Sequence, residues 1–158
     1  MNAKESVTAL YAAYASGDAA RITAMLHEDV VWTAPAGNAT QVALGLGQAD
    51  DAGAPFGANN LGRRQIVQFM AHNFARLFKD AKNEFRALVA EGDLVFAEHR
   101  FSGVLPNGRS YVNDYCFAFQ VRDGKVWRIR EYMDTRGGWA QVFGTNEPKP
   151  LLAYVEQD

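Results

Sequence analysis

A change of period along the chain constrains the fold more than any other feature of the sequence. After residues 79–80, apolar and polar side chains alternate with a period of two as far as residue 133, which is typical of β-strands. Turn signals at 91–93, 106–109 and 123–124 divide this segment, and the Asn-Gly pair within 106–109 favours a tight hairpin. The pattern predicts a four-stranded antiparallel meander.

The first half of the chain has helical spacing instead. Apolar residues recur every three or four positions over 4–16, 19–26 and 63–78, which predicts amphipathic helices in these segments. Between the first two helices, Gly17 suits the left-handed end of one helix and Asp18 suits the N-cap of the next. The helical segments can therefore cover one face of the predicted sheet.

A short strand is predicted between the second and third helices. Residues 27–29 are expected to form a polar turn, and the β-branched and aromatic residues 30–33 then form a strand that Pro35 stops. This strand can add to an edge of the meander.

Residues 36–62 are rich in glycine and have no period, so we expect a long loop inserted in a single domain of residues 1–158. A phosphate cradle is disfavoured because the segment has no G-x-x-x-x-G-K-[ST] motif. A lid over a pocket and a plain surface insertion both stay open. Phe56 is the one large aromatic anchor in the loop.

Composition excludes several classes of function. With 16 basic and 18 acidic residues among 158, and no run of one sign, the chain lacks the charge pattern of a nucleic-acid binder. One cysteine, Cys116, forms no internal disulfide, and the spacing of His27, His72 and His99 does not suit a metal. No segment approaches the roughly 20 apolar residues of a membrane span, and the N-terminus lacks the apolar block of a signal peptide. We expect a cytoplasmic protein without a cofactor or metal, which contacts neither membranes nor nucleic acids.

The order of elements predicts an α+β fold with the helices packed on one face of a curved antiparallel sheet. If the sheet curls, that face can enclose a pocket. The opposite face mixes apolar residues such as Phe96 and Cys116 with charged residues such as Arg100 and Asp114. Such a face suits a homodimer interface, and exposure to solvent is the competing interpretation.

Alternation also predicts which side chains face the helices. In the first strand of the meander, Phe85, Ala87 and Val89 share one face. In the last strand the predicted inward residues are Trp127, Ile129, Glu131 and Met133. Glu131 is thus one carboxyl group in an apolar row. Burial of an ionised carboxylate costs several kcal/mol, so such a group is normally paired, protonated or used in chemistry.

The chain runs in the order helix, Gly-Asp break, short helix, HEDVVWTAP strand, glycine loop, LGRRQIVQF helix and a meander ending in GKVWRIREYMDT. In this order of elements it resembles the SnoaL-like group of the nuclear transport factor 2-like superfamily, which includes ketosteroid isomerases and limonene epoxide hydrolases. The resemblance covers about residues 5–140. It implies a conical α+β barrel whose concave face and N-terminal helices enclose one apolar pocket, often in a dimer packed through the outer sheet face.

The catalytic patterns of these relatives are only partly present. Compared with the epoxide hydrolases, Glu131 stands where one aspartate of the Asp-Arg-Asp site would be, His99 replaces the arginine and Phe101 replaces the other aspartate. Trp32 and Ala34 replace the tyrosine and asparagine that help to hold the attacking water.

Compared with the ketosteroid isomerases, the base aspartate falls near Ala34 and the tyrosine of the first helix falls at or near Leu10. The resemblance therefore implies the fold and the pocket, while both patterns lose essential groups.

The predicted pocket is mostly an aromatic wall with a few polar groups, which suits a small apolar ligand. The candidate catalytic residues are His99, Glu131, Asn113 and Tyr115. The candidate ligand-binding residues are Tyr11, Tyr14, Trp32, Phe56, Phe69, Phe101, Phe117 and Met133.

We hypothesise that His99 and Glu131 form an acid/base pair that moves a proton on the ligand, while Asn113 and Tyr115 donate hydrogen bonds to a carbonyl oxygen. The alternative is a buried pair that only orders the core. The corresponding functions are a cofactor-free isomerase, cyclase or hydrolase acting on a polyketide-, terpenoid- or steroid-like molecule, or a non-catalytic module for ligand binding or dimerisation.

Overall fold

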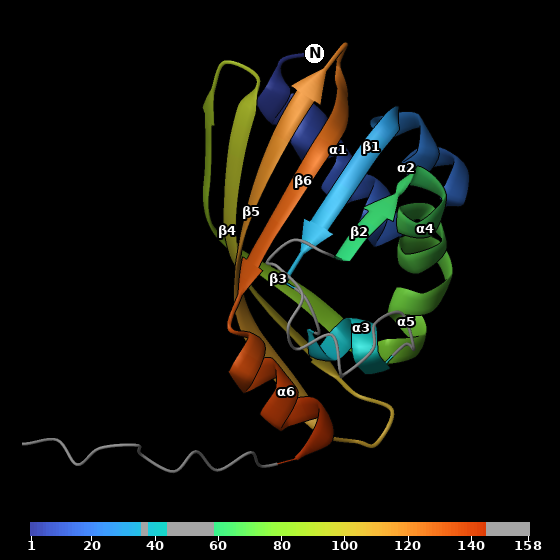
Figure 1. Cartoon of the computed structure of the whole chain (residues 1–158), viewed down its shortest axis with the longest axis vertical. Coiled ribbons are helices and arrows are strands. Elements are labelled where there is room, and N and C mark those ends of the chain that lie inside the picture. The colour runs from blue at the N-terminus through green and yellow to red at the C-terminus, as the bar shows by residue number, and fades with distance from the viewer. Residues whose placement is uncertain (36–37, 44–58, 145–158) are drawn as a thin grey trace, which may run out of the picture.

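The computed structural model of the chain describes residues 1–35, 38–43 and 59–144. Helices pack against one face of a curved six-stranded sheet, with α1 crossing behind the strands and α2, α4 and α5 on the side of β1 and β2 (Figure 1). The predicted α+β class, with N-terminal helices against a curved and mostly antiparallel sheet, is confirmed.

The sheet has the strand order β2-β1-β6-β5-β4-β3. Its strands are β1 (Leu26–Ala34), β2 (Asn59–Gly62), β3 (Lys79–Glu91), β4 (Leu94–Val104), β5 (Ser110–Arg122) and β6 (Lys125–Met133). Strands β3 to β6 form the predicted antiparallel meander. The early strand β1 joins β6 in parallel, so the last strand of the meander lies inside the sheet.

Helix α1 (Ala3–Ser16) begins and ends with favourable local chemistry. Asn2 and Glu5 form a capping box: the Glu5 N–H donates to Asn2 Oδ1 at 2.9 Å, and the Asn2 N–H donates to Glu5 Oε2 at 2.8 Å. Gly17 ends the helix with φ 64°, a left-handed conformation that glycine adopts without a steric penalty. The predicted role of Gly17 is confirmed.

Helix α2 (Ala19–Met25) starts at Asp18, as predicted. Oδ1 of Asp18 accepts hydrogen bonds from the N–H groups of Ala20 at 2.8 Å and Arg21 at 3.1 Å. The predicted polar turn at 27–29 is wrong, because these residues belong to β1. The register between β1 and β6 shifts within this part of the strand, and this irregularity accommodates polar residues that sequence alone reads as a turn.

The predicted helix at 63–78 is present with a change of winding in its middle. It consists of α4 (Arg63–Gln68), a π-helical turn η2 (Phe69–Asn73) and α5 (Phe74–Leu77). The predicted loop at 36–62 is wrong near both ends, where α3 (Ala39–Ala43) and β2 form. Phe56 lies outside the described residues.

A bulge in β3 changes which of its side chains face inward, so one predicted face of this strand is wrong. Phe85 pairs with His99, but the register shifts before Ala87. An extra residue reverses the alternation, so Val89 does not share the inner face with Phe85 and is 61% exposed. Leu88 packs against the core instead.

A second bulge corrects the predicted face of β6. The register between β5 and β6 shifts next to Val121, which pairs with Val126. Val126 is therefore buried, and Trp127, predicted to face inward, lies partly exposed. The guanidinium carbons of Arg122 and Arg128 lie 3.8 and 4.1 Å from the centre of the Trp127 ring. These cation–π contacts stabilise the outward position of the indole.

Helix α6 (Thr135–Phe143) follows β6 and has no counterpart among the sequence-based expectations. It begins at Asp134, whose Oδ1 accepts from the Gly137 N–H at 2.8 Å. The Gln141 side chain pins the helix to β5, because it accepts from the Val112 N–H at 2.6 Å and donates to the Val112 carbonyl at 2.9 Å.

We predict that Asp18→Ala lowers the free energy of unfolding by about 1 kcal/mol, because two N–H groups at the start of α2 lose their acceptor. Urea denaturation measures the change. Asp18→Asn keeps a capping oxygen and should stay close to wild type. Equal losses for both substitutions would contradict the capping role.

Candidate functional site

A cavity of about 720 Å³ lies between the helices and the inner face of the sheet. Its aromatic walls come from Tyr11, Tyr14, Trp32, Phe69, Phe74, Phe78, Phe85, Phe101, Tyr115, Phe117 and Phe119. Its polar lining residues include His99 and Glu131. The size and the mainly apolar lining are those of a site for a small molecule.

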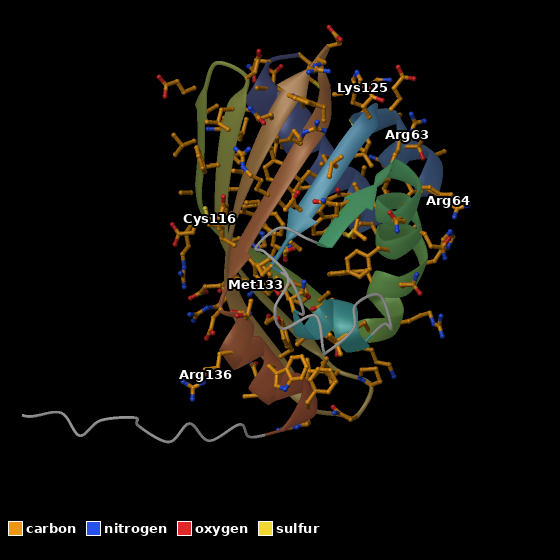
Figure 2. All side chains as sticks on the ribbon, in the orientation of Figure 1. Arg63, Arg64, Cys116, Lys125, Met133 and Arg136 are labelled. Atoms are coloured by element: carbon orange, nitrogen blue, oxygen red, sulfur yellow. The ribbon has the colours of Figure 1, made fainter. Side chains whose placement is uncertain are left out.

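Most of the predicted site residues meet around this cavity. Those that line it are Tyr11, Tyr14, Trp32, Phe69, His99, Phe101, Tyr115, Phe117 and Glu131. Asn113 and Met133 are not among the lining residues. The Asn113 amide is bonded to Tyr111 and to the backbone of Asp134, and Met133 stands at the end of β6 near α6 (Figure 2).

The Glu131 carboxyl group is buried, with 7% of the residue exposed. The indole N–H of Trp32 donates to Glu131 Oε2 at 2.9 Å. Burial raises the pKa of Glu131 to about 8, and the Trp32 hydrogen bond opposes that shift only in part. Glu131 is therefore mostly protonated at neutral pH.

The role of Trp32 was missed, since the sequence indicated only an aromatic wall. Trp32 is on β1, and its neighbour across the parallel pairing is Ile129 of β6. The indole N–H can therefore reach a carboxyl group two residues further along β6. The available signal was an indole on a strand predicted to add to an edge of the meander, but no local pattern encoded which of the two edge strands it would join.

His99 is a buried and neutral imidazole. Its ring lies nearly parallel to Tyr115, at 17° with centroids 5.7 Å apart, and to Phe117, at 6° with centroids 5.6 Å apart. Neither Nδ1 nor Nε2 has a hydrogen-bond partner among the described residues. Burial lowers the pKa of His99 to about 4, because no nearby acceptor stabilises the charged form.

The predicted acid/base pair does not form in this structure. In the described parts of the chain, no hydrogen bond or ion pair joins His99 to Glu131. A carboxylate partner would raise the pKa of the imidazole, whereas burial lowers it. The two residues share a cavity but act as separate polar groups.

Two tyrosines of α1 add further unused hydrogen-bonding groups. The hydroxyl oxygens of Tyr11 and Tyr14 are buried and have no partner among the described residues. Burial raises the pKa of both phenols, so both keep their protons. An unpaired buried polar group typically costs about 1–3 kcal/mol. A bound molecule with suitably placed polar atoms can recover this free energy.

The described residues contain no group of three or more metal-ligand side chains. None of the described helices has the length and apolar character that a membrane crossing needs.

The fold defines an α+β protein of the nuclear transport factor 2-like class. Residues 7–129 match the SnoaL-like domain, so the chain belongs to the SnoaL-like family. No curated protein sequence matches the chain significantly.

Solved structures share this fold. An NTF2-like protein from Burkholderia thailandensis is 22% identical with a TM-score of 0.69, over 90% of this chain and 97% of that chain. IdmH, a putative polyketide cyclase from Streptomyces antibioticus, is 21% identical with a TM-score of 0.68, over 90% and 99%. TerC, co-crystallised with polyporic acid, is 24% identical with a TM-score of 0.67, over 87% and 95%. At these identities the likeness shows the fold alone.

We predict that the free energy of unfolding falls between about pH 6.5 and 8, and that Glu131→Gln removes this fall. The folded chain keeps the Glu131 proton up to about pH 8, whereas the unfolded chain loses it near 4.5, so stability drops as pH rises between these values. His99 has the opposite effect, but only between its folded pKa of about 4 and its unfolded value of 6.5. Above pH 6.5 the Glu131 effect remains, at about 1.4 kcal/mol per pH unit.

Urea denaturation at closely spaced pH values measures this slope. Glu91→Gln removes an exposed carboxyl group and serves as the control that should keep the wild-type slope. The same slope in the Glu131→Gln protein would show that Glu131 ionises normally in the folded chain.

Proposed function

We propose that the chain binds a small, mainly apolar molecule with oxygen substituents in its cavity and catalyses a cofactor-free proton transfer on it. The reaction class is that of an isomerase or cyclase, and the ligand class is polyketide-, terpenoid- or steroid-like. The observation that carries the proposal is a single buried carboxyl group, with its pKa raised to about 8, in an apolar cavity with unpaired polar atoms.

Ligand binding is supported by the lining of the cavity. Aromatic walls supply apolar contact area, while Tyr11, Tyr14 and His99 hold buried polar atoms that have no partner among the described residues. A purely hydrocarbon ligand would leave these groups unpaired. A ligand with oxygen atoms can pair with them, which favours oxygenated molecules over hydrocarbons of the same shape.

Proton transfer is supported by the environment of Glu131. A group with a pKa near the working pH serves both as base and as acid, because both forms are populated. The ionised carboxylate would take a proton from a carbon next to a carbonyl group, and the resulting acid would return a proton to another carbon or to oxygen. Trp32 orients the carboxyl group through Oε2 in both forms. The proton balance closes without an oxidant or reductant.

His99 has a different role in this proposal from the one predicted. As a neutral ring it can donate through one nitrogen and accept through the other, so it serves to hold a polar atom of the ligand. The hydrolase alternative loses support, since Glu131 is the only carboxyl group among the described residues that line the cavity.

A non-catalytic binding module is the second candidate. It is favoured by the lack of contact between His99 and Glu131 and by a carboxyl group that is mostly neutral at neutral pH. Such a module would bind the same ligands and leave their carbon-bound protons in place.

We also propose a homodimer packed through the outer sheet face. Phe96, Val112 and Tyr132 are 43, 42 and 42% exposed. Arg100 and Asp114 form a bidentate pair beside them at 2.8 and 2.9 Å, and Cys116 lies on this side of the sheet, away from α1 (Figure 2). Sedimentation equilibrium tests this assembly, and a monomer at micromolar concentration would contradict it.

We predict that the protein accelerates exchange of the carbon-bound protons next to the carbonyl of 2-tetralone in D₂O, and that Glu131→Gln lowers this rate by about 100-fold or more. The variant keeps an acceptor for Trp32 but cannot take up the proton. Mass spectrometry follows deuterium incorporation. Glu91→Gln is the surface control. Binding of 2-tetralone without any exchange would favour the non-catalytic module.

The pH profile of the same reaction tests the role of Trp32. The rate should rise with pH to a plateau above about 8 as Glu131 ionises. Trp32→Phe removes the hydrogen bond that lowers the pKa of Glu131, so the midpoint should move to higher pH. An unchanged midpoint would mean that this bond does not control the ionisation.

A further inference from the structure

A chain of hydrogen bonds runs from the start of α6 across β5 towards the cavity. The Asn113 Oδ1 accepts from the Asp114 N–H at 2.9 Å, which fixes the orientation of the amide. The Asn113 Nδ2 therefore donates, to the Asp134 carbonyl at 2.9 Å and to the Tyr111 hydroxyl oxygen at 3.2 Å. The Asn113 amide therefore fixes the direction of donation in this hydrogen-bond chain, from Asn113 towards Tyr111.

The next link joins two tyrosine hydroxyl groups. The oxygens of Tyr111 and Tyr115 are 2.8 Å apart, so one hydroxyl group donates a hydrogen bond to the other. The accepting hydroxyl group keeps its own proton, which has no acceptor within the pair. If Tyr111 kept that proton, a donor in a residue with 0% exposure would have no partner among the described residues. If Tyr115 keeps it, the donor belongs to a side chain that lines the cavity. The cost of a buried unpaired donor favours donation from Tyr111 to Tyr115.

We propose that the Tyr115 hydroxyl is a directed donor to a carbonyl, enolate or phenolate oxygen of the bound ligand, and that Tyr111 and Asn113 are its positioning residues. The assignment deepens the proposed function and rests on it, because it needs a ligand in the cavity. Asn113 acts here through Tyr111 and Tyr115 and does not contact the ligand. The donor chain polarises the last hydroxyl, since each accepted hydrogen bond strengthens the next donation.

The surrounding packing holds this donor in place. The Tyr115 ring is stacked at 17° on His99 and at 14° on Phe117. On the other side, α6 comes so close that a Cβ on Gly138 would lie 3.2 Å from the Tyr111 hydroxyl oxygen and 3.4 Å from Asn113 Nδ2. Glycine at this position lets α6 cover the network. Burial also raises the pKa of Tyr115 well above its usual value, which keeps the donor protonated.

The test compares 2-acetylnaphthalene with 2-isopropylnaphthalene, which has nearly the same shape and no acceptor. Calorimetry gives both affinities, and infrared difference spectra of the ¹³C-labelled ketone report hydrogen bonding to its carbonyl. In the wild-type protein the ketone should bind more tightly, with its carbonyl stretch at lower wavenumber than in hexane. Tyr115→Phe should weaken ketone binding by about three- to tenfold, leave the hydrocarbon unaffected and move the stretch to higher wavenumber.

The positioning role of Tyr111 has its own readout. Tyr111→Phe should move the carbonyl stretch part of the way towards the Tyr115→Phe value, and should have no effect on it in the Tyr115→Phe background. Glu91→Gln, the exposed surface control used above, should match wild type. If Tyr111→Phe fails to fold, the Tyr115→Phe comparison of the two ligands still decides the donor assignment.

Each result is informative. Equal binding of ketone and hydrocarbon, or an unchanged carbonyl stretch in Tyr115→Phe, would overturn the donor assignment. A Tyr111→Phe effect that persists without the Tyr115 hydroxyl would overturn the relay. If Tyr115→Phe changes ketone binding and the carbonyl stretch as expected, but the protein exchanges no protons on 2-tetralone, the donor assignment is supported and the catalytic function is contradicted. If the protein binds neither naphthalene compound, the donor assignment and the proposed function are both contradicted.

Discussion

The burial of one carboxyl group in the apolar inner face of the sheet is the constraint on which the site depends. Glu131 has the Trp32 indole as its hydrogen-bond donor and no cation among the described residues to stabilise a charge. The group therefore stays mostly protonated at neutral pH. It also ties β1 to β6 by a side-chain bond, so the same interaction that limits ionisation helps to join the early strand to the meander.

The cavity around Glu131 lowers the stability of the protein but provides polar groups that can bind a ligand. Tyr11, Tyr14 and His99 hold polar atoms that have lost water without gaining partners among the described residues. A protein optimised only for stability would place apolar side chains at such positions. The aromatic rings that stack around His99 fix its position all the same, and an ordered but unpaired polar group is suited to recognising a ligand.

Sequence patterns were reliable where one local rule decided the outcome. The period of two and the turn signals predicted β4 and β5, and Gly17 and Asp18 set the break between α1 and α2. The errors fall where one extra residue shifts the strand pairing. Bulges beside Ala87 and Val126 reversed the alternation, so Val89 and Trp127 face outward.

By itself, the sequence determined the α+β class, the family resemblance and most of the cavity wall, because alternation and helical spacing are properties of neighbouring residues. Only the tertiary structure decided how the polar groups meet. It bonded Glu131 to Trp32 of β1, left His99 without a partner among the described residues, and turned Asn113 away from the cavity towards Tyr111 and α6. These contacts depend on strand register, bulges and the docking of α6, which join segments far apart in the chain and leave no local pattern.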